Sequence, residues 1–374
     1  MTRSSSRKAP SPPVRCDMAE KALIAMSGGV DSGVAAYLTK QLGYDCIGCT
    51  MKLFENSDAA VTDSGKTCCT LDDAEDARAV AFRLGMPHYV FNFKEGFRRE
   101  VIDKFVRCYQ RGETPNPCID CNRTMKFAGL LARAQELHCA KIVTGHYARI
   151  EETPEGFLLK KAADTSKDQS YVLYMLTQAQ LAQILFPLGN LKKTQVREIA
   201  EEQGFVNAHK RESQDICFVP DGDYARVIEA NTGIRPEPGE FVDTAGNVIG
   251  QHRGIIHYTV GQRRGLGISI GKSAYVVAID PVRNRVVIGD NADLFSDTVR
   301  VRDVNWIAGN PPAASVRCSA KIRYRHPEQP AVLRFLDETT AELKFETPQR
   351  AVTAGQAAVF YDGDVVLGGG TITA

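Results

Sequence analysis

Lys21-Ala-Leu-Ile-Ala-Met-Ser-Gly-Gly-Val-Asp-Ser32 is the stretch of sequence that decides the fold. Its apolar beginning predicts a short buried strand, and the apolar spacing from Asp31 to Leu42 predicts a helix. The glycines between them let the backbone approach a ligand closely. The free N–H groups at the start of the helix favour an anion, and the hydroxyls of Ser27 and Ser32 add donors. We therefore expect a phosphate-binding loop here rather than an ordinary tight turn.

This loop differs from the Walker type of phosphate-binding loop, because no Gly-Lys-Ser or Gly-Lys-Thr follows the glycines. Asp31 is an unfavourable neighbour for a phosphate. We expect its carboxylate either to cap the helix or to face Mg²⁺.

Strand and helix signals alternate through the first half of the chain. The segments 45–51, 88–91 and 141–144 are predicted strands, and 71–84 is a predicted helix that begins with several acidic residues. This alternation predicts an α/β domain with a doubly wound parallel sheet.

Short strands and turn signals replace this pattern after about residue 208. The segment 274–288 predicts a β-hairpin, and the strands that follow it predict a small all-β barrel. We therefore expect a catalytic domain over 20–208, a central β-rich segment over 209–275 and a barrel over 276–374. Residues 1–19 are expected to be a disordered tail or the product of a mis-called start codon, with an organellar presequence as the alternative.

The composition is that of an ordinary globular protein, with 43% hydrophobic and 24% charged residues. The net charge of +1 argues against a uniformly basic nucleic-acid coat, although local basic patches still act over roughly 8–10 Å. No apolar run approaches the roughly 18 residues that span a bilayer. The cysteine count of 11, an odd number without a secretory signal peptide, predicts a cytoplasmic protein in which most thiols are inert.

A second informative stretch is Thr114-Pro-Asn-Pro-Cys-Ile-Asp-Cys-Asn122, which holds Cys118 and Cys121 in a Cys-x-x-Cys pattern. We expect Asn122 to cap the following helix, and a thiol at the helix start to have a lowered pKa. The pattern alone permits a redox pair, half of a zinc site or ligands of an iron–sulfur cluster. Cys217, taken alone, is typical of a small core residue on an apolar strand.

Five motifs occur in order along the chain. They are Ala25-Met-Ser-Gly-Gly-Val-Asp-Ser32, Pro115-Asn-Pro-Cys-Ile-Asp-Cys-Asn122, Thr144-Gly-His-Tyr-Ala148, Lys167-Asp-Gln-Ser-Tyr171 and Asp215-Ile-Cys-Phe218. With these motifs the chain resembles the tRNA-specific 2-thiouridylases, the MnmA/TrmU family of the PP-loop ATP pyrophosphatase superfamily. The segments 260–267 and 354–361 extend the resemblance, which covers residues 20–374.

The resemblance implies an enzyme that replaces O2 of the wobble uridine, U34, with sulfur in tRNAs for Lys, Glu and Gln. ATP adenylates O2, which turns a poor leaving group into a good one. A persulfide on Cys217 then delivers sulfur, AMP leaves, and Cys121 releases the sulfur by forming a disulfide with Cys217. The implied cofactors are ATP and Mg²⁺, the implied sulfur donor is a cysteine desulfurase or a relay protein, and the family suggests a monomer.

The resemblance also implies individual binding residues. Those expected to bind ATP are Ala25, Met26, Ser27, Gly28, Gly29, Val30, Asp31, Ser32, Met51 and Gly145. Those expected to bind the anticodon stem-loop of tRNA are Asn116, Pro117, His146, Lys167, Asp168, Gln169, Arg323, Tyr324 and Gln356. We also expect a phosphate-facing patch, or else a scattered solvated face, from Arg253, Arg263, Arg264, Arg323 and Arg325.

Cys118 departs from the family pattern, which most often has Asp at this position, and so puts a carboxylate role there in doubt. The departure makes Cys118, Cys121 and Cys217 three catalytic candidates. Three thiolates leave one iron of a [4Fe–4S] cluster open to carry an extra sulfide. A cluster on these residues is therefore the alternative to the persulfide.

Two rival functions stay open on the sequence alone. One is another PP-loop activity, such as a carboxylate-adenylating ligase or a different tRNA-modifying enzyme, which would not need Cys121 and Cys217 together with a barrel. The other is a non-catalytic RNA-binding or iron–sulfur protein, which would not need the PP-loop.

Overall fold

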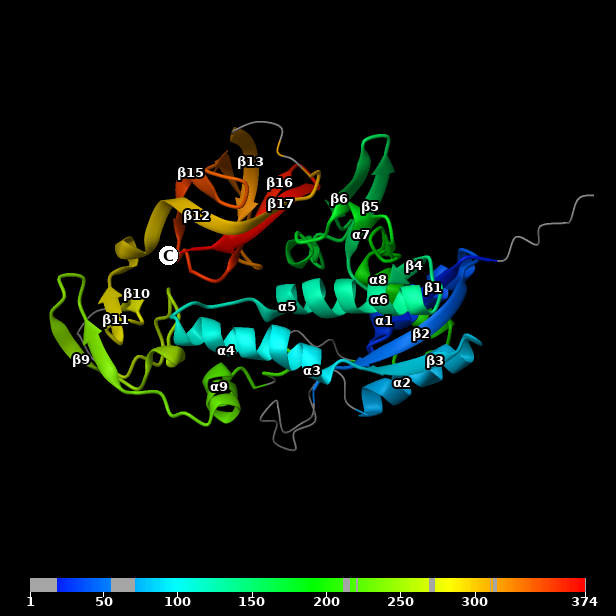
Figure 1. Cartoon of the computed structure of the whole chain (residues 1–374), viewed down its shortest axis with the longest axis horizontal. Helices are drawn as coiled ribbons and strands as arrows, with labels where there is room; N and C mark the ends of the chain where they lie inside the picture. The colour runs from blue at the N-terminus through cyan, green and yellow to red at the C-terminus, as the bar shows by residue number, and fades with distance from the viewer. Residues whose placement is uncertain are drawn as a thin grey trace, which may run out of the picture.

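The computed structural model describes residues 19–54, 71–210, 216–219, 221–268, 273–309, 311 and 315–373. The predicted tail lies almost entirely outside these residues, and so does Asp215, the first residue of the motif around Cys217. Figure 1 shows an elongated molecule with the N-terminal domain at one end, the middle sheet of β9, β10 and β11 at the other, and the barrel between them along one side.

A parallel sheet forms the centre of the N-terminal domain, in the order β3-β2-β1-β4-β7. Its strands are β1 (Lys21–Ala25), β2 (Asp45–Lys52), β3 (His88–Asn92), β4 (Lys141–Val143) and β7 (Ile184–Leu185). The strand order reverses direction at β1, because β2 lies on one side of it and β4 on the other. This confirms the predicted doubly wound α/β fold.

Helices cover both faces of this sheet, and alternate residues of β1 show why. Ala22 and Ile24 pack into one core with α1 (Val30–Gln41), α2 (Leu71–Arg83) and α8 (Lys193–Glu202). Leu23 points the other way, into a core with Phe97 and Phe127. Side chains alternate across a strand, so a strand that is apolar throughout is buried on both faces.

Two long helical rods cover the second face (Figure 1). The first consists of α3 (Lys94–Phe97), the π-helical η1 (Arg98–Ile102) and α4 (Asp103–Gln110). The second consists of α5 (Pro117–Asp120), the π-helical η2 (Cys121–Gly129) and α6 (Leu130–Glu136). Shorter helical elements are η3 (Ser170–Val172), α7 (Gln178–Leu181) and α9 (Tyr224–Thr232).

The predicted cap at Asn122 is wrong. The helix begins earlier, at Pro117, and the Asn116 side chain caps it by accepting the backbone N–H of Cys118 at 3.1 Å. Proline suits the first helical position because its φ is already helical and its missing N–H is not needed there. Asn122 is instead buried inside the helix and donates to the Val172 carbonyl at 2.9 Å.

The middle of the chain forms a separate sheet in the order β10-β11-β8-β9. Its elements are β8 (Gly239–Val242), β9 (Val248–His252), η4 (Ile255–His257), β10 (Tyr275–Asp280) and β11 (Arg285–Gly289). The predicted hairpin is confirmed as β10–β11, but it pairs with β8. The expected boundary at 275/276 would cut this hairpin from its sheet, so the pairing favours a boundary near residue 290.

A closed β-barrel completes the chain, as expected. After η5 (Asn291–Leu294) come β12 (Phe295–Trp306), β13 (Ser315–Lys321), β14 (Gln329–Phe335), β15 (Ala341–Arg350), β16 (Ala357–Asp362) and β17 (Val365–Ile372). Pairing of β12 with both β15 and β17 closes the barrel. The N-terminal hairpin of β5 (Ala148–Thr153) and β6 (Gly156–Lys161) joins it through β17.

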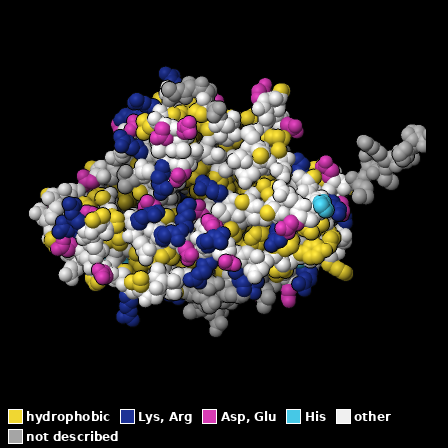
Figure 2. Space-filling model, viewed as in Figure 1, with side chains coloured by type: hydrophobic (Ala, Val, Ile, Leu, Met, Phe, Trp, Pro, Cys, Tyr) yellow, Lys and Arg dark blue, Asp and Glu magenta, His cyan; other side chains and the backbone are white. Residues whose placement is uncertain are grey.

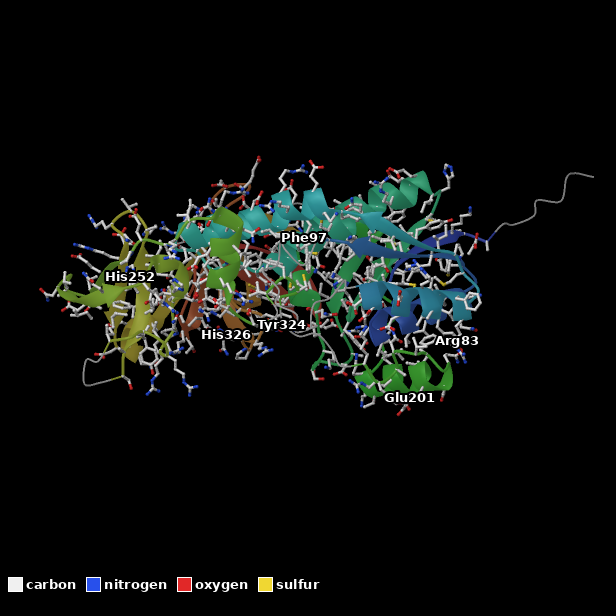
Figure 3. The ribbon with its side chains drawn as sticks, turned by 90° about the horizontal axis from the view of Figure 1, so that it is seen from below. Arg83, Phe97, Glu201, His252, Tyr324 and His326 are labelled. Carbon is white, nitrogen blue, oxygen red and sulfur yellow. The ribbon has the colours of Figure 1, made fainter. Side chains whose placement is uncertain are left out.

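Figure 3 shows how these parts lie along the molecule. His252 of the middle sheet lies near one end, and Arg83 and Glu201 of the N-terminal domain lie near the other. Tyr324, at the rim of the barrel, lies between them. Within the described residues, no helix has the length and apolar character needed to cross a membrane.

Candidate active site

The glycine loop turns at the carboxyl end of β1 and leads directly into α1. Gly28 has a φ of +72°, and a side chain there would overlap the Asp73 carbonyl at the start of α2. Gly29 is the N-cap of α1 and supplies no side-chain bond, so the first N–H groups of the helix are available to a ligand. The Ser32 hydroxyl stabilises the turn by accepting the Ser27 N–H at 3.2 Å and donating to the Gly29 carbonyl at 3.0 Å.

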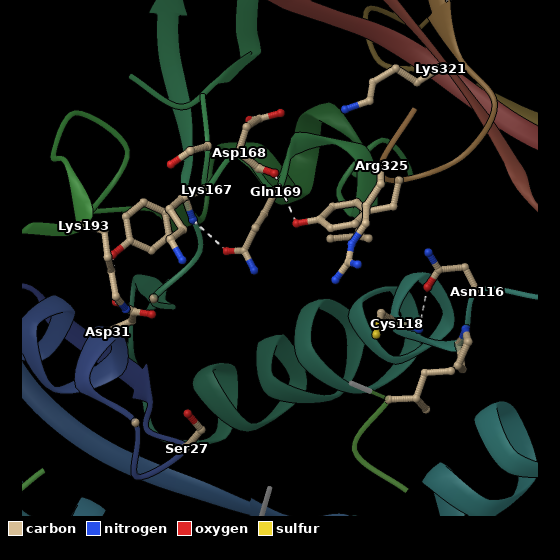
Figure 4. A pocket seen from close by; sticks show the side chains of 18 of the residues that line it. Ser27, Asp31, Asn116, Cys118, Lys167, Asp168, Gln169, Lys193, Lys321 and Arg325 are labelled. Carbon is tan, nitrogen blue, oxygen red and sulfur yellow. Dashed lines mark hydrogen bonds and ion pairs between the residues drawn. The ribbon is translucent and has the colours of Figure 1, made fainter. Parts of the chain in front are cut away.

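Asp31 does not cap α1, so the first of the two expectations for it is wrong. It lies in the first turn of the helix, and one of its oxygens, Oδ1, accepts two hydrogen bonds. The Lys193 ammonium donates at 2.7 Å and the Tyr147 hydroxyl at 2.8 Å (Figure 4). The carboxylate thus lies within the anion-binding loop but is neutralised by a lysine from α8.

A cavity of about 930 Å³ joins this loop to the cysteine motif and to the barrel. The loop contributes Ser27, Gly29, Val30 and Asp31 to its lining, and the capped helix contributes Asn116, Pro117 and Cys118. The barrel contributes Lys321, Tyr324, Arg325 and Gln356. Figure 4 shows Asp31 and Cys118 on opposite sides of the cavity, with Arg325 reaching in between.

A second cavity, of about 190 Å³, opens beside the same loop. Its lining includes Ala25, Met26, Ser32 and Met51, and it shares Ser27, Asp31, Gly145 and Gln169 with the large cavity. Gly145 must be a glycine, because a Cβ there would lie 2.9 Å from the Ser32 nitrogen. Of the residues expected to bind ATP, only Gly28 lines neither cavity; it packs against α2 instead.

The three candidate cysteines have different surroundings. Cys118 is exposed and lines the large cavity. Cys121, one turn further along the helix, is half-buried. Cys217 is also half-buried and packs against the same apolar core as Cys121, while its neighbour Ile216 reaches the large cavity. Phe218 anchors this segment through edge-on contacts with Phe97 and Phe105, at 5.8 and 5.2 Å between ring centroids.

The expectation of a lowered thiol pKa is wrong for Cys121. Burial raises its pKa to about 11, although the nearby Lys126 ammonium acts in the opposite direction. Because the helix begins at Pro117, Cys121 lies a turn inside it, where the free N–H groups of the helix start no longer act on the thiol. The Cys121 thiol is therefore protonated at neutral pH in this state of the protein.

Most residues expected to bind tRNA line the large cavity. Lys167, Asp168 and Gln169 do so from the loop after β6, and Tyr324 and Gln356 do so from the barrel. The Tyr324 hydroxyl donates to the Asp168 carbonyl at 3.3 Å, and the Gln356 amide donates to the Thr114 carbonyl at 2.7 Å. The barrel and the N-terminal domain thus meet at the cavity.

Two residues expected to bind tRNA lie elsewhere. His146 is buried at the small cavity between the rings of Phe127 and Phe186, and burial lowers its pKa so that the ring is neutral. The Arg323 guanidinium faces inward and donates to the carbonyls of Val260 at 2.9 Å and Ala351 at 3.1 Å. Of the arginines expected to form a patch, only Arg325 lines the large cavity.

Sequence reasoning missed several residues that line the large cavity or support its loop. Lys193 and Tyr147 hold Asp31, and Lys210 holds Asp73 and Asp76 at 2.7 and 2.5 Å. Asn207 donates to the Gly28 carbonyl at 2.9 Å. Lys193, Lys210 and Asn207 come from α8 and the segment after it, far from the loop in sequence. No spacing rule connects them to it, and Tyr147 alone lies within a quoted motif.

The donor set suits a nucleotide with Mg²⁺ better than it suits an iron–sulfur cluster. Asp31 supplies a carboxylate oxygen inside the cavity, beside free helix N–H groups, as a magnesium–phosphate site requires. By contrast, no three His, Cys, Asp or Glu side chains in the described part of the chain are grouped to hold a metal ion. The alternative of a cluster on Cys118, Cys121 and Cys217 therefore does not fit the described arrangement.

Comparison with known proteins gives three domain matches along the chain. Residues 20–221 match the tRNA methyl transferase HUP domain, 231–290 the tRNA methyl transferase PRC-barrel domain, and 296–372 the aminomethyltransferase β-barrel domain. Among solved structures, a 4-thiouridine synthetase–RNA complex with bound ATP aligns with 56% of this chain and 50% of that chain. Its sequence identity is 18% and its TM-score 0.33, too low for an inference.

Relatives of full length are much more similar. A tRNA-specific 2-thiouridylase MnmA of Lachnoclostridium phytofermentans is 51% identical over 354 residues, which cover 94% of this chain and 99% of that protein. Another of the same name, from Clostridioides difficile, is 49% identical and covers 95% of this chain and 98% of that protein. With this similarity over nearly the whole length, and with the loop, the cysteines and the barrel in one structure, the chain belongs to the family of tRNA-specific 2-thiouridylases.

Proposed function

We propose that this enzyme adenylates O2 of the wobble uridine, U34, in tRNA and replaces it with sulfur carried as a persulfide on Cys217. The observation that carries the proposal is the large cavity, which is lined by the phosphate-binding loop, the Cys118 helix and the barrel. A nucleotide and a nucleic-acid base must meet in such a reaction, and this cavity reaches all three parts. The volume of about 930 Å³ is at the upper end for ligand sites.

In the first step the loop holds ATP, and the uracil O2 attacks the α-phosphorus while pyrophosphate leaves. The helix N–H groups after Gly29 hold the phosphates, and Asp31 would hold the Mg²⁺ that neutralises the departing pyrophosphate. The small cavity, with Met51 at the end of β2, is the natural place for the nucleoside part of ATP.

In the second step the terminal sulfur of the Cys217 persulfide attacks C2 of the base. The Cys121 thiolate then attacks the inner sulfur, the S–S bond breaks, and AMP leaves as the C2–O bond breaks. The products are 2-thiouridine and a Cys121–Cys217 disulfide, which a thiol reductant must reduce by two electrons before the next cycle. A cysteine desulfurase or a relay protein reloads Cys217 with sulfur.

The raised pKa of Cys121 suits this order of events. A thiol that stays protonated until substrate arrives does not consume the persulfide on Cys217 early, because the thiolate is the attacking form. Cys118 takes no covalent part in this scheme; it lines the cavity where the family usually has a carboxylate. Gln169, Tyr324, Lys167 and Arg325 would contact the tRNA around the target base.

Nucleoside mass spectrometry of tRNA tests the proposal directly. The purified chain, unmodified tRNA, ATP, cysteine and a cysteine desulfurase should give 2-thiouridine, and Cys217→Ser should give none. Cys318→Ser, which removes a thiol from barrel strand β13, is the matched control and should behave like the wild type. Full thiolation by Cys217→Ser would overturn the persulfide, and an iron-dependent, coloured active preparation would favour the cluster instead.

A further inference from the structure

Lys193 is a buried cation at an unusual place in the fold. It is the first residue of α8, next to Lys192, and the first turn of this helix has no acidic residue. Cations are unfavourable at a helix N-terminus, because they face the positive end of the dipole. Local preferences of this kind are most often broken where a residue serves a function.

The surroundings of Lys193 compensate for this position. Its backbone N–H donates to an Asp164 carboxylate oxygen at 3.0 Å, which supplies the negative charge that the helix start lacks. Its ammonium group lies 5.8 Å from the centroid of the Tyr147 ring and donates to Asp31 at 2.7 Å. Only 11% of the side chain is exposed. The lysine is therefore held inside the site rather than on its surface.

The partner of Lys193 is a residue that should oppose nucleotide binding. Asp31 lies in the loop that would hold the phosphates, and an uncompensated carboxylate there would repel them. Lys193 neutralises it in the structure, and both side chains line the large cavity. Lys210, another lysine in the cavity lining, donates instead to Asp73 and Asp76.

We propose that Lys193 is a phosphate-binding residue of the nucleotide site, stored on Asp31 until ATP and Mg²⁺ arrive. Asp31 would hold the Mg²⁺, and the Lys193 ammonium would then exchange Asp31 for the phosphates. A lysine suits this exchange, since its charge sits on a flexible four-carbon stem and can move by side-chain rotation alone. The inference rests on the proposed ATP site and assigns it a residue that none of the sequence motifs contains.

The equilibrium dissociation constant of ATP, measured by calorimetry on the full chain, tests the exchange. Lys193→Met should weaken binding by about 10- to 100-fold, the range for one lost charged hydrogen bond. The loss should be larger in EDTA than in Mg²⁺, because Asp31 is then bare. Lys193→Arg should retain much of the affinity. The matched control is Lys192→Met, which removes the same charge from the exposed neighbour and should bind ATP like the wild type.

Asp31→Asn tests the Lys193–Asp31 ion pair by removing the charge of its other member. In EDTA it should bind ATP more tightly than the wild type, because the negative charge of Asp31 is gone and no longer competes with the phosphates for Lys193. In Mg²⁺ it should bind more weakly, because the metal ligand is lost. This variant decides the matter if Lys193→Met does not fold, as judged by its thermal unfolding.

Different results would contradict the proposed function and the role of Lys193. A wild-type chain that does not bind ATP at all contradicts the proposed function itself. Three results would overturn the role of Lys193 and leave the proposed function intact. They are wild-type affinity of a folded Lys193→Met in both buffers, an equal loss of affinity in Lys192→Met, or an Asp31→Asn variant that binds ATP no more tightly in EDTA.

Discussion

Cys118 and Cys121 lie one helical turn apart, yet one is exposed to the cavity and the other is half-buried. Burial raises the pKa of Cys121 to about 11, so only a small fraction is thiolate at neutral pH. A group with a raised pKa gains thiolate as the pH increases towards that value. The reactivity of Cys121 towards an alkylating agent should therefore rise about tenfold per pH unit between pH 7 and 9, without a plateau.

Peptide mass spectrometry after timed iodoacetamide labelling of the nucleotide-free enzyme measures this rate for Cys121. Lys126→Met should slow the labelling further, since the Lys126 ammonium favours the thiolate. A rate that levels off below pH 8 would show that the thiol is activated and would contradict the burial argument.

At this scale the sequence predicted motif residues well and their partners poorly. The family resemblance marked Asp31, but its spacing could not reveal Lys193, because the two meet only when α8 packs beside α1. Arg323 shows the opposite error. An arginine in a basic stretch suggests a phosphate contact, whereas here packing turns it inward onto the Val260 and Ala351 carbonyls.

The phosphate-binding loop is the element on which the chemistry depends, and Gly28 is its least replaceable residue. Its φ of +72° is costly for other residues, and a Cβ would overlap the Asp73 carbonyl. Gly28→Ala should therefore abolish ATP binding, measured by calorimetry, and lower the free energy of unfolding by more than the roughly 1–2 kcal/mol of backbone strain alone.

Gly43→Ala is a matched control for this change. Gly43 also has a positive φ, +89°, but a Cβ there meets nothing within 4 Å. This variant should show the backbone strain and keep full ATP binding. Equal loss of ATP binding in both variants would mean that the fit of the loop against α2 is not what the nucleotide site requires.

Whole elements were predicted better than their ends. The strand–loop–helix unit over β1 and α1 follows from apolar periodicity and two glycines, and the structure confirms it. The Cys118 helix is capped by Asn116, but the prediction put the cap at Asn122, because asparagine is a good cap at either position. Pro117 was the signal that separates them, since proline favours the first helical position.

In the whole molecule the barrel and the glycine loop line the same cavity. Although the net charge is only +1, the positive charges are unevenly distributed over the surface. Figure 2 shows Lys and Arg side chains grouped over α4 and α5, near the middle of the face shown. On the cavity side, Arg325 is the exposed barrel arginine that reaches towards the loop (Figure 4). Phosphate contacts of this kind weaken with salt, because bound counterions are released from the nucleic acid.

Arg325→Ala should weaken tRNA binding and reduce the slope of log affinity against log salt by about 1, while ATP binding stays unchanged. Filter binding of tRNA over a series of salt concentrations measures both. Arg334→Ala, which removes an exposed arginine of barrel strand β14 outside the cavity lining, should leave the affinity and slope as they are. If the two variants behave alike, the barrel does not present Arg325 to the tRNA.

The sequence did not predict which strands from distant parts of the chain pair with each other. The barrel was predicted from alternating strands, but β5–β6 belongs to the N-terminal half and still pairs with β17. The Arg149 guanidinium reinforces this join by donating to Asp364 at 2.7 Å. Because such pairs are hundreds of residues apart, no local pattern marks them, and the cavity they help to shape is visible only in three dimensions.

The stoichiometry of AMP and 2-thiouridine tests the central claim, that adenylation drives the sulfur transfer, most directly. Under single-turnover conditions with persulfide-loaded enzyme, tRNA and ATP, nucleotide chromatography and nucleoside mass spectrometry should find one AMP and one pyrophosphate for each 2-thiouridine. Thiolation without ATP, or with ADP and phosphate as the nucleotide products, would contradict the account.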